Sequence, residues 1–322
     1  MENKESCKTM KKLSFVIPCY GSENTIEGVI TEINEVASQR ESEFTYEIIC
    51  VNDCSPDDVM AKLRELVESQ ENLTVVNLAR NSGKHAAVMA GYSFVTGDYV
   101  VNLDDDGQCP MDKLWELIEQ LENGSDLVIA SYNTKKQSRF KNFGSNVNNV
   151  MTKILLNKPK DLRFENFSVA KRFVIEEILH YRNPYPFLEG LYLRTTQNIA
   201  TVKMDERERF EGVGAFTLKK SLSLWLNGFT AFSVKPLRIA TVLGFLVAFI
   251  GFIYAIVLVV QYFVRGMMPG FASLMVATLV IGGMIMMLLG LIGEYIGRIY
   301  ISINNAPQYV IREVLKGEEC DE

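Results

Sequence analysis

Histidine and paired cysteine are scarce in this sequence, and their scarcity limits the chemistry it can perform. Among 322 residues there are two histidines and six cysteines. The cysteines form no C-x-x-C pair and no cluster with histidine. We therefore expect free thiols in a reducing compartment rather than disulfides or a zinc site. The six are Cys7, Cys19, Cys50, Cys54, Cys109 and Cys320.

Basic residues are also fewer than acidic ones. The 33 lysines and arginines are outnumbered by 39 aspartates and glutamates, which gives a net charge of −6. This balance argues against a general nucleic-acid-binding protein, which needs a basic surface. Residues 1–12 are polar and contain no apolar run, so we expect no secretion signal there.

Two long apolar runs stand near the C-terminus. In Ile239–Val264 the only strongly polar side chain is Gln261, and Phe271–Gly293 is interrupted only by Ser273 and Thr278. Each run exceeds the roughly 20 residues that a helix needs to cross a bilayer. The short connection between them predicts a transmembrane hairpin.

The basic residues indicate how such a hairpin would be oriented. The connection carries only Arg265, whereas basic residues flank both outer ends: Lys235, Arg238, Arg298, Arg312 and Lys316. Because positive charge stays on the cytoplasmic side, we expect both chain ends in the cytoplasm. The preceding residues, 217–233, interleave apolar and polar side chains at helical spacing. They predict either a helix lying in the membrane interface or a core helix of the preceding domain.

The first two hundred residues alternate between β-rich apolar runs and amphipathic helical patterns. Continuous apolar strands separated by helices indicate a mostly parallel sheet covered on both faces. The predicted strands are Leu13–Pro18, Tyr46–Asn52, Leu73–Leu78, Tyr99–Asp104 and Leu127–Ser131, and the predicted helices are Glu23–Ala37, Asp57–Ser69, Lys84–Phe94 and Met111–Glu122.

Polar residues follow four successive strands, where ligands bind in sheets of this kind. Asp104 and Asp106 alternate at a strand end and could hold Mg²⁺ or Mn²⁺, with Gln108 adding a neutral oxygen. Such an ion stabilises charge on a departing diphosphate. Arg80 and Lys84 are candidate counter-charges for phosphates. Alone, such a pattern is usually a solvated surface turn or a surface charge, and the position of the four motifs after four successive strands is what favours a site.

Two further residues in these segments are suited to a nucleotide. Gly83 would let the backbone approach an anion at a helix N-terminus. Asp53 could accept an N–H from a pyrimidine base. His85 and His180 are expected to be structural.

These motifs resemble the inverting family-two glycosyltransferases of GT-A fold. The P-x-Y-N-E, R-N-x-G-K-H-x-A and D-x-D-x-Q-x-P segments of that family are matched at residues 18–23, 80–87 and 104–110, with Gly21 in place of Asn and one residue inserted before Glu23. Residues 289–298 look like the end of the second membrane helix of bacterial members. Within the family the chain is most similar to polyprenol-phosphate glycosyltransferases, the group of dolichol-phosphate mannose synthases and undecaprenyl-phosphate glucosyl- and aminoarabinosyltransferases.

The resemblance implies a function and a set of site residues. It implies transfer of a sugar from a UDP-linked donor to undecaprenyl phosphate, with Mg²⁺ or Mn²⁺, at the cytoplasmic face of a bacterial inner membrane. A homo-oligomer is possible, and no nucleic acid is involved. The metal ligands would be Asp104, Asp106 and Gln108, and Arg209 would contact the acceptor phosphate. The donor would be bound by Pro18, Tyr20, Glu23, Asp53, Arg80, Asn81, Gly83 and Lys84.

The resemblance also divides the chain and leaves alternatives. The expected parts are a catalytic domain, an interfacial helix, the membrane hairpin and a cytoplasmic tail, at residues 1–215, 216–236, 237–298 and 299–322. The family's F-R-L and R-x-x-G-x-S-K segments are altered here, at residues 166–169 and 209–215. A synthase with a sugar hydroxyl acceptor, which would need a carboxylate base such as Asp161 or Glu165, and a non-catalytic scaffold of the same fold stay open.

The end of the chain carries one more expectation. After the turn-like Asn305–Gln308, the short run Tyr309–Ile311 is rich in β-forming residues. We predict that it returns to a cytoplasmic domain, its own or that of another copy, and adds a strand at a sheet edge.

Overall fold

The computed structural model describes residues 10–132, 164–205, 207, 235–265, 270–304 and 306–317. The chain divides into two compact units. The first is Met1–Thr217 together with Asn305–Glu322, and the second is Leu218–Asn304.

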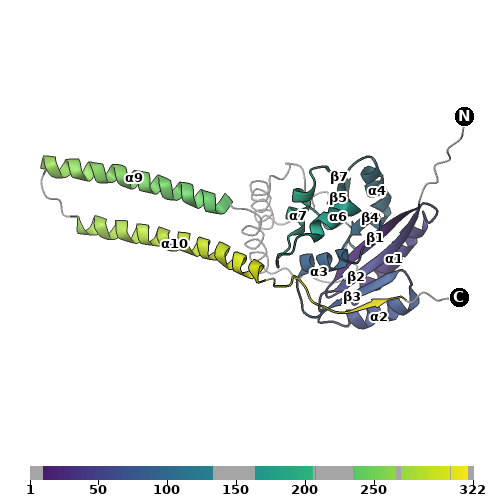
Figure 1. Cartoon of the computed structure of the whole chain (residues 1–322). Coiled ribbons are helices and arrows are strands. Elements are labelled where there is room, and N and C mark those ends of the chain that lie inside the picture. The colour runs from purple at the N-terminus through teal and green to yellow at the C-terminus, as the bar shows by residue number, and fades with distance from the viewer. Residues whose placement is uncertain are drawn as a thin grey trace, which may run out of the picture. The chain divides into compact units, whose positions relative to one another are not determined.

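The first unit is built on an eight-stranded sheet with the order β7-β5-β6-β4-β1-β2-β3-β8. Figure 1 labels β7, β5, β4, β1, β2 and β3 in this unit. Only β6 and β8 run antiparallel to their neighbours. The expected mostly parallel sheet is therefore confirmed. The strands are β1 (Lys11–Cys19), β2 (Phe44–Asn52), β3 (Leu73–Leu78), β4 (Tyr99–Asn102), β5 (Leu127–Tyr132), β6 (Ser168–Lys171), β7 (Ile199–Met204) and β8 (Ile311–Lys316).

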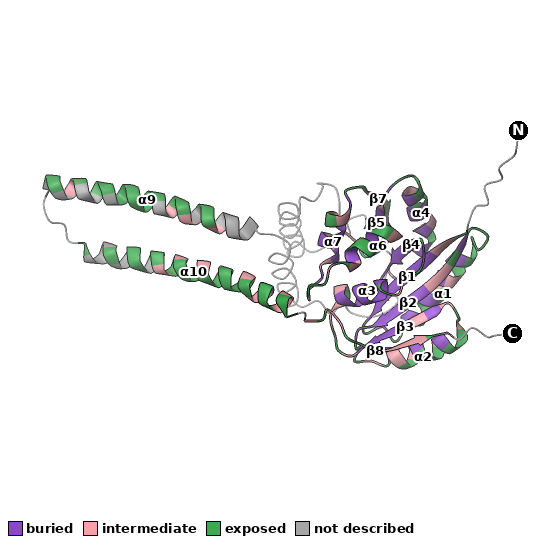
Figure 2. Cartoon of the chain, viewed as in Figure 1, coloured by how far each residue is buried: buried purple, intermediate pink, exposed green. Residues whose placement is uncertain are grey.

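Helices cover the sheet on both faces. Alternate residues of β1, such as Phe15 and Ile17, pack with the buried faces of α1, α2 and α4, whereas Val16 faces α3. The strands are buried on both faces, as their purple colour in Figure 2 shows, and this burial explains why their sequences are continuously apolar. The helices are α1 (Ile26–Ser38), α2 (Val59–Ser69), α3 (Lys84–Tyr92), η1 (Met111–Lys113), α4 (Leu114–Glu122), α6 (Arg172–Leu179) and α7 (Leu188–Thr195).

The C-terminal tail adds the expected edge strand. β8 pairs antiparallel with β3, from Thr74 opposite Lys316 to Leu78 opposite Ile311. The strand begins at Ile311, the last residue of the run Tyr309–Ile311 from which it was predicted, and continues to Lys316. The backbone contact begins one residue earlier, since the Ala79 N–H donates to the Val310 carbonyl at 2.8 Å.

The second unit contains two long helices, α9 (Lys235–Arg265) and α10 (Phe271–Ile303). The two predicted apolar runs lie within them. Large apolar side chains on both helices are exposed: Phe245, Phe263 and Met287 are 75%, 81% and 76% exposed. Figure 2 accordingly draws most of the described part of both helices in green. Such a surface needs an apolar environment or partner. Among the described residues, Val280–Ile303 is long and apolar enough to cross a membrane, and Ala240–Tyr254 is a shorter apolar stretch.

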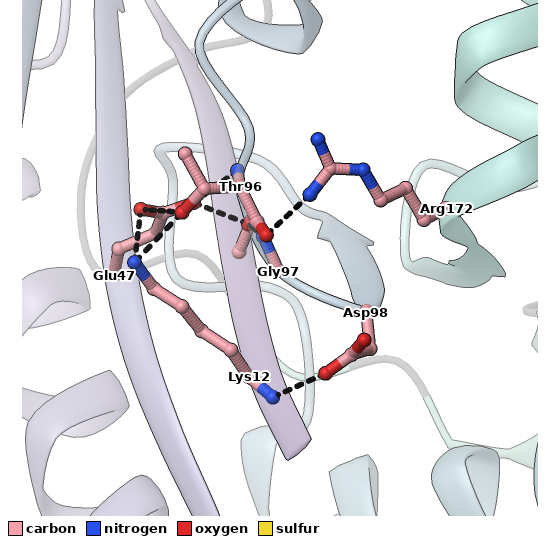
Figure 3. A network of polar contacts seen from close by, with 7 residues as sticks. Lys12, Glu47, Thr96, Gly97, Asp98 and Arg172 are labelled. Carbon is pink, nitrogen blue, oxygen red and sulfur yellow. Dashed lines mark hydrogen bonds and ion pairs between the residues drawn. The ribbon is translucent and has the colours of Figure 1, made fainter.

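A polar network holds the amino ends of β1, β2 and β4 together (Figure 3). The Lys12 backbone N–H donates to Asp98 at 2.9 Å, and the Lys12 ammonium pairs with Glu47 at 2.7 Å. Burial raises the pKa of Glu47, but hydrogen bonds from Lys12, Ser14 and Thr96 outweigh it, so that the pKa lies below its usual value. This end of the sheet is therefore occupied by structural contacts.

Gly97, at the centre of this network, has no room for a side chain. A Cβ there would lie 2.6 Å from the Lys12 carbonyl oxygen and 2.7 Å from the Ser14 hydroxyl. Both neighbours belong to β1, so the strand itself would have to move. We expect Gly97→Ala to lower stability by about 1–3 kcal/mol, seen as a lower thermal midpoint of the full chain. Gly251→Ala, where a Cβ meets open space, is the matched control. An unchanged midpoint for Gly97→Ala would contradict this packing.

Candidate functional site

The loops that follow β1 and β4 meet at the point where strand order reverses. β1 pairs in parallel with both β2 and β4, so these loops leave the same edge on either side of a switch point. The Tyr20 backbone N–H donates to the Asp105 carboxylate at 2.9 Å, and the Thr25 hydroxyl donates to the Asp105 carbonyl at 2.6 Å. Pro18 is paired within the sheet, opposite Val51, while the Tyr20 side chain is half exposed above it.

Glu23 and the loop after β2 are joined by two hydrogen bonds of opposite direction. The Glu23 N–H donates to Asp57 at 2.9 Å, and the Asp58 N–H donates to the Glu23 carboxylate at 3.3 Å. The Gly21 N–H donates to the Ser55 hydroxyl at 2.7 Å. These bonds place the first two predicted segments side by side.

Asp53 joins the loop after β2 to the loop after β3. Its two carboxylate oxygens accept the backbone N–H groups of Ser82 and Gly83 at 2.6 and 2.9 Å, and its carbonyl accepts the Asn81 side chain at 3.2 Å. Burial raises the pKa of Asp53, and these hydrogen bonds only partly offset it. Asp53 thus organises the neighbouring loop, a role that the sequence did not suggest. Each oxygen keeps a second lone pair that could accept a base N–H.

The loop after β3 leads directly into α3. Gly83 has φ +86°, a conformation that favours glycine, and α3 begins at the next residue. Lys84 pairs with Asp104, and exposed Arg80 donates to the Pro307 carbonyl of the tail at 3.2 Å. The N-terminus of α3 and these two cations form a setting suited to phosphate.

The three consecutive aspartates after β4 have different partners. Asp104 pairs with Lys84 through one oxygen and accepts the Asn166 side chain at 2.7 Å through the other. Asp106 accepts the Gln108 backbone N–H at 3.1 Å. Burial raises the pKa of Asp105 to about 6, against the opposing effect of the Tyr20 N–H. From the sequence Asp105 had no assigned role, and Asn166 was noted only as part of the altered segment 166–169.

Gln108 connects this loop to the segment after β7. Its side-chain nitrogen donates to the Arg207 carbonyl at 3.2 Å, and the Arg207 N–H donates to the Gln108 carbonyl at 3.3 Å. The Arg207 guanidinium pairs with Glu32 and Asp112. Arg207 is therefore held by acids and lies beside the aspartate loop. Arg209 itself, Asp161 and residues 216–234 of the expected helix lie outside the described residues, and the last two residues of that helix, 235 and 236, belong to α9.

The donor set at this edge consists of oxygen atoms, which suits Mg²⁺ or Mn²⁺. Within the described ranges no three histidine, cysteine, aspartate or glutamate side chains are grouped closely enough to hold an ion by themselves. A cation held by Asp104 and Asp106 would need oxygens from a bound ligand to complete its shell, as Mg²⁺ at phosphate sites commonly does.

Comparison with known proteins identifies the class. Residues 14–179 match the profile of Glycosyl transferase family 2, and residues 235–299 match the GtrB C-terminal hairpin. An uncharacterized glycosyltransferase of Synechocystis is 33% identical over 94% of this chain and 95% of its own length. The chain belongs to glycosyl transferase family 2, and it is a glycosyltransferase.

Two other proteins add detail. A prophage-derived bactoprenol glucosyl transferase of Shigella flexneri is 31% identical over 95% of this chain and 99% of its own length. Mannosyl-3-phosphoglycerate synthase from Rubrobacter xylanophilus shares the fold, with a TM-score of 0.50 and 17% identity over 71% of this chain and 74% of that structure. The GT-A fold expected from the sequence is confirmed, and so is its C-terminal hairpin family.

His85 predicts a pH dependence of stability. Its ring meets Phe187 edge to face at 5.6 Å, and within the described residues its Nδ1 atom is buried without a hydrogen-bond partner. Burial, and secondarily the charge of Lys84, lowers the pKa of His85 from 6.5 to about 4. The unfolded chain therefore binds more protons between these values, and stability falls as the pH drops through this window.

Replacing His85 should remove this dependence. We expect wild type to lose on the order of 1–2 kcal/mol between pH 7 and pH 5 that His85→Asn does not lose. Thermal midpoints of the full chain at the two pH values measure the difference, since all other groups titrate alike in both proteins. Equal losses would show that His85 is solvated or charged in the folded state.

Proposed function

We propose that this chain transfers a sugar from a UDP-sugar to a polyprenyl phosphate, with inversion at the sugar, at the cytoplasmic face of a bacterial inner membrane. The observation that carries the proposal is the meeting of four post-strand loops around Asp104–Asp106, beside the N-terminus of α3. Carboxylates that suit a cation and cations that suit phosphates lie together there. This is the arrangement that a nucleotide diphosphate requires.

The donor would be held by the loops in order. The α3 N-terminus, Arg80 and Lys84 would face the phosphates, while Asp53 would accept from the base and Asn81 would support Asp53. Pro18, Tyr20 and Glu23 would form the opposite wall through the contacts described above. Asp104, Asp106 and Gln108 would hold Mg²⁺ or Mn²⁺, which stabilises negative charge on the departing diphosphate.

A lipid phosphate acceptor fits a site whose described residues include no catalytic histidine–carboxylate pair. With a second pKa of about 6, a phosphate monoester is mostly ionised at neutral pH and attacks without a strong base. The names of the bactoprenol glucosyl transferases and the matched hairpin support such an acceptor. In this arrangement α9 and α10 cross the membrane as a pair, with 1–215 and 299–322 on the cytoplasmic side and 216–236 at the interface.

The metal role is tested by Asp106→Asn. Because the variant loses a charged ligand of the ion, we expect transfer to fall by at least a hundredfold while the thermal midpoint without ligands stays within about 2 °C of wild type. Radiolabelled transfer to undecaprenyl phosphate measures activity, with and without EDTA. Wild-type turnover by the variant in EDTA would refute metal-assisted transfer.

The acceptor role of Arg209 is tested by Arg209→Ala. A charge-assisted hydrogen bond to the lipid phosphate would be lost, so the apparent KM for undecaprenyl phosphate should rise roughly tenfold or more, with UDP binding unchanged. Arg182→Ala removes an exposed arginine from the α6–α7 connection and serves as the control. Loss of UDP binding with lipid affinity intact would assign Arg209 to the donor site instead.

A further inference from the structure

A chain of buried amides runs from the loop after β2 to the C-terminal strand. The Ser55 N–H donates to Asn52 Oδ1 at 3.0 Å, Asn52 Nδ2 donates to Asn77 Oδ1 at 2.9 Å, and Asn77 Nδ2 donates to Glu313 Oε1 at 2.7 Å. Asn52 and Asn77 are only 4% and 6% exposed. The three acceptors belong to three neighbouring strands, β2, β3 and β8. The row of hydrogen bonds therefore runs across these strands to the edge strand of the sheet.

The carboxylate of Glu313 sets the direction of every bond in this chain. An ionised carboxylate only accepts hydrogen bonds, so it requires the NH₂ group of Asn77 to face it. The oxygen of Asn77 must then face Asn52 and can be satisfied only by the NH₂ group of Asn52. The oxygen of Asn52 is thereby turned toward Ser55, the one orientation in which it can accept the backbone N–H.

Glu313 is kept ionised by its neighbours. Hydrogen bonds from Asn77 and Arg64, in that order, lower the pKa of Glu313. Arg64 on α2 pairs with the same carboxylate oxygen, Oε1, that accepts from Asn77. Glu313 therefore remains an acceptor-only group throughout the neutral range.

The Ser55 end of this chain of amides lies in the proposed donor site. Ser55 follows Cys54, which has φ +51°, an uncommon conformation for a residue with a side chain, so the turn needs external support. The Ser55 hydroxyl accepts the Gly21 N–H, and Asp53 on the other side of the turn accepts from Ser82 and Gly83. Fixing Ser55 therefore fixes the turn that joins three of the four loops.

The tail reaches the same site at a second place. The Pro307 carbonyl accepts from Arg80, and the side-chain nitrogen of Gln308 donates to the carbonyls of Tyr181 and Asn183 at 2.8 Å each. The segment just after α10 thus bridges the loop after β3 and the α6–α7 connection, before β8 supplies Glu313. These contacts show that the tail is seated on the donor loops themselves, and not only on the outer edge of β3.

We propose that Glu313 is a positioning residue for the donor site. Through Asn77 and Asn52 it orients the Asp53–Ser55 turn that binds the nucleotide. The proposal rests on the proposed function, because it assumes that these loops bind a nucleotide diphosphate. A rival role is simple stabilisation, in which Glu313 serves only as the ion-pair partner of Arg64 at a sheet edge.

Reversing the polarity of the amide chain separates the two roles. Glu313→Lys places a donor where an acceptor is required, so both amides must flip and the Ser55 N–H loses its acceptor. Asn77→Asp places two carboxylates in contact. In the double variant the new lysine donates to the new aspartate, which still accepts from Asn52, so the original direction is restored. Glu313→Gln keeps an acceptor, and Arg64→Ala removes the ion pair alone.

We expect Glu313→Lys to weaken UDP binding by about tenfold, the effect of one lost hydrogen bond to a buried group. Asn77→Asp should bind UDP within about threefold of wild type, because its aspartate still accepts from Asn52 and leaves the Asn52 oxygen facing Ser55. The double variant and Glu313→Gln should bind within about threefold of wild type, and Arg64→Ala should be unchanged. Calorimetric titration of the full chain with UDP and Mg²⁺ at 25 °C gives the affinities. If the double variant binds no better than Glu313→Lys, or if Arg64→Ala weakens binding as much as Glu313→Lys, the positioning role is refuted.

Hydrogen–deuterium exchange tests the amide chain without assuming that the site binds a UDP-sugar. Peptides covering residues 53–57 and 80–84 should exchange faster in Glu313→Lys than in wild type and should recover in the double variant. If wild type fails to bind UDP yet this exchange pattern appears, the proposed donor is wrong and the amide chain stands. Normal UDP binding with unchanged exchange in Glu313→Lys would overturn the amide chain and leave the proposed function intact.

Discussion

The parallel pairing of β1 with both β2 and β4 is the constraint on which the site depends. It sends the loops after β1, β2, β3 and β4 to one edge of the sheet, where their backbone N–H groups and carboxylates bind one another. Most of the carboxylates there are already engaged with N–H groups or Lys84. The edge is therefore organised before a ligand arrives, and a diphosphate with its cation would enter a prepared electrostatic setting.

Much of the fold could be predicted because burial on both faces leaves a plain signal. Both ends of β3, Leu73–Leu78, were predicted correctly. The observed strands β1, β2 and β5 extend beyond their predicted ranges by no more than two residues at either end. The strands β6 and β7 were missed. β6 is four residues long, and β7 is only partly buried and alternates weakly, so neither carries a distinctive pattern.

The site was predicted at the level of segments and not of contacts. Residues whose role follows from their own chemistry, such as Lys84 beside Asp104, could be named from the motif. Asp105 could not, because its role depends on the backbone of Tyr20, 85 positions away. The same holds for Asn52, Asn77 and Glu313, which look like ordinary strand residues until the register of β8 places them in line.

The most direct test of the account is to identify the product that this enzyme makes. The purified full chain would be incubated with Mg²⁺, undecaprenyl phosphate and a panel of radiolabelled UDP-sugars, and the organic phase would be analysed for labelled lipid. The account predicts one labelled lipid, released by mild acid as free sugar and absent when the lipid phosphate is omitted. Label that accumulates instead in a polysaccharide, with or without the lipid, would contradict it.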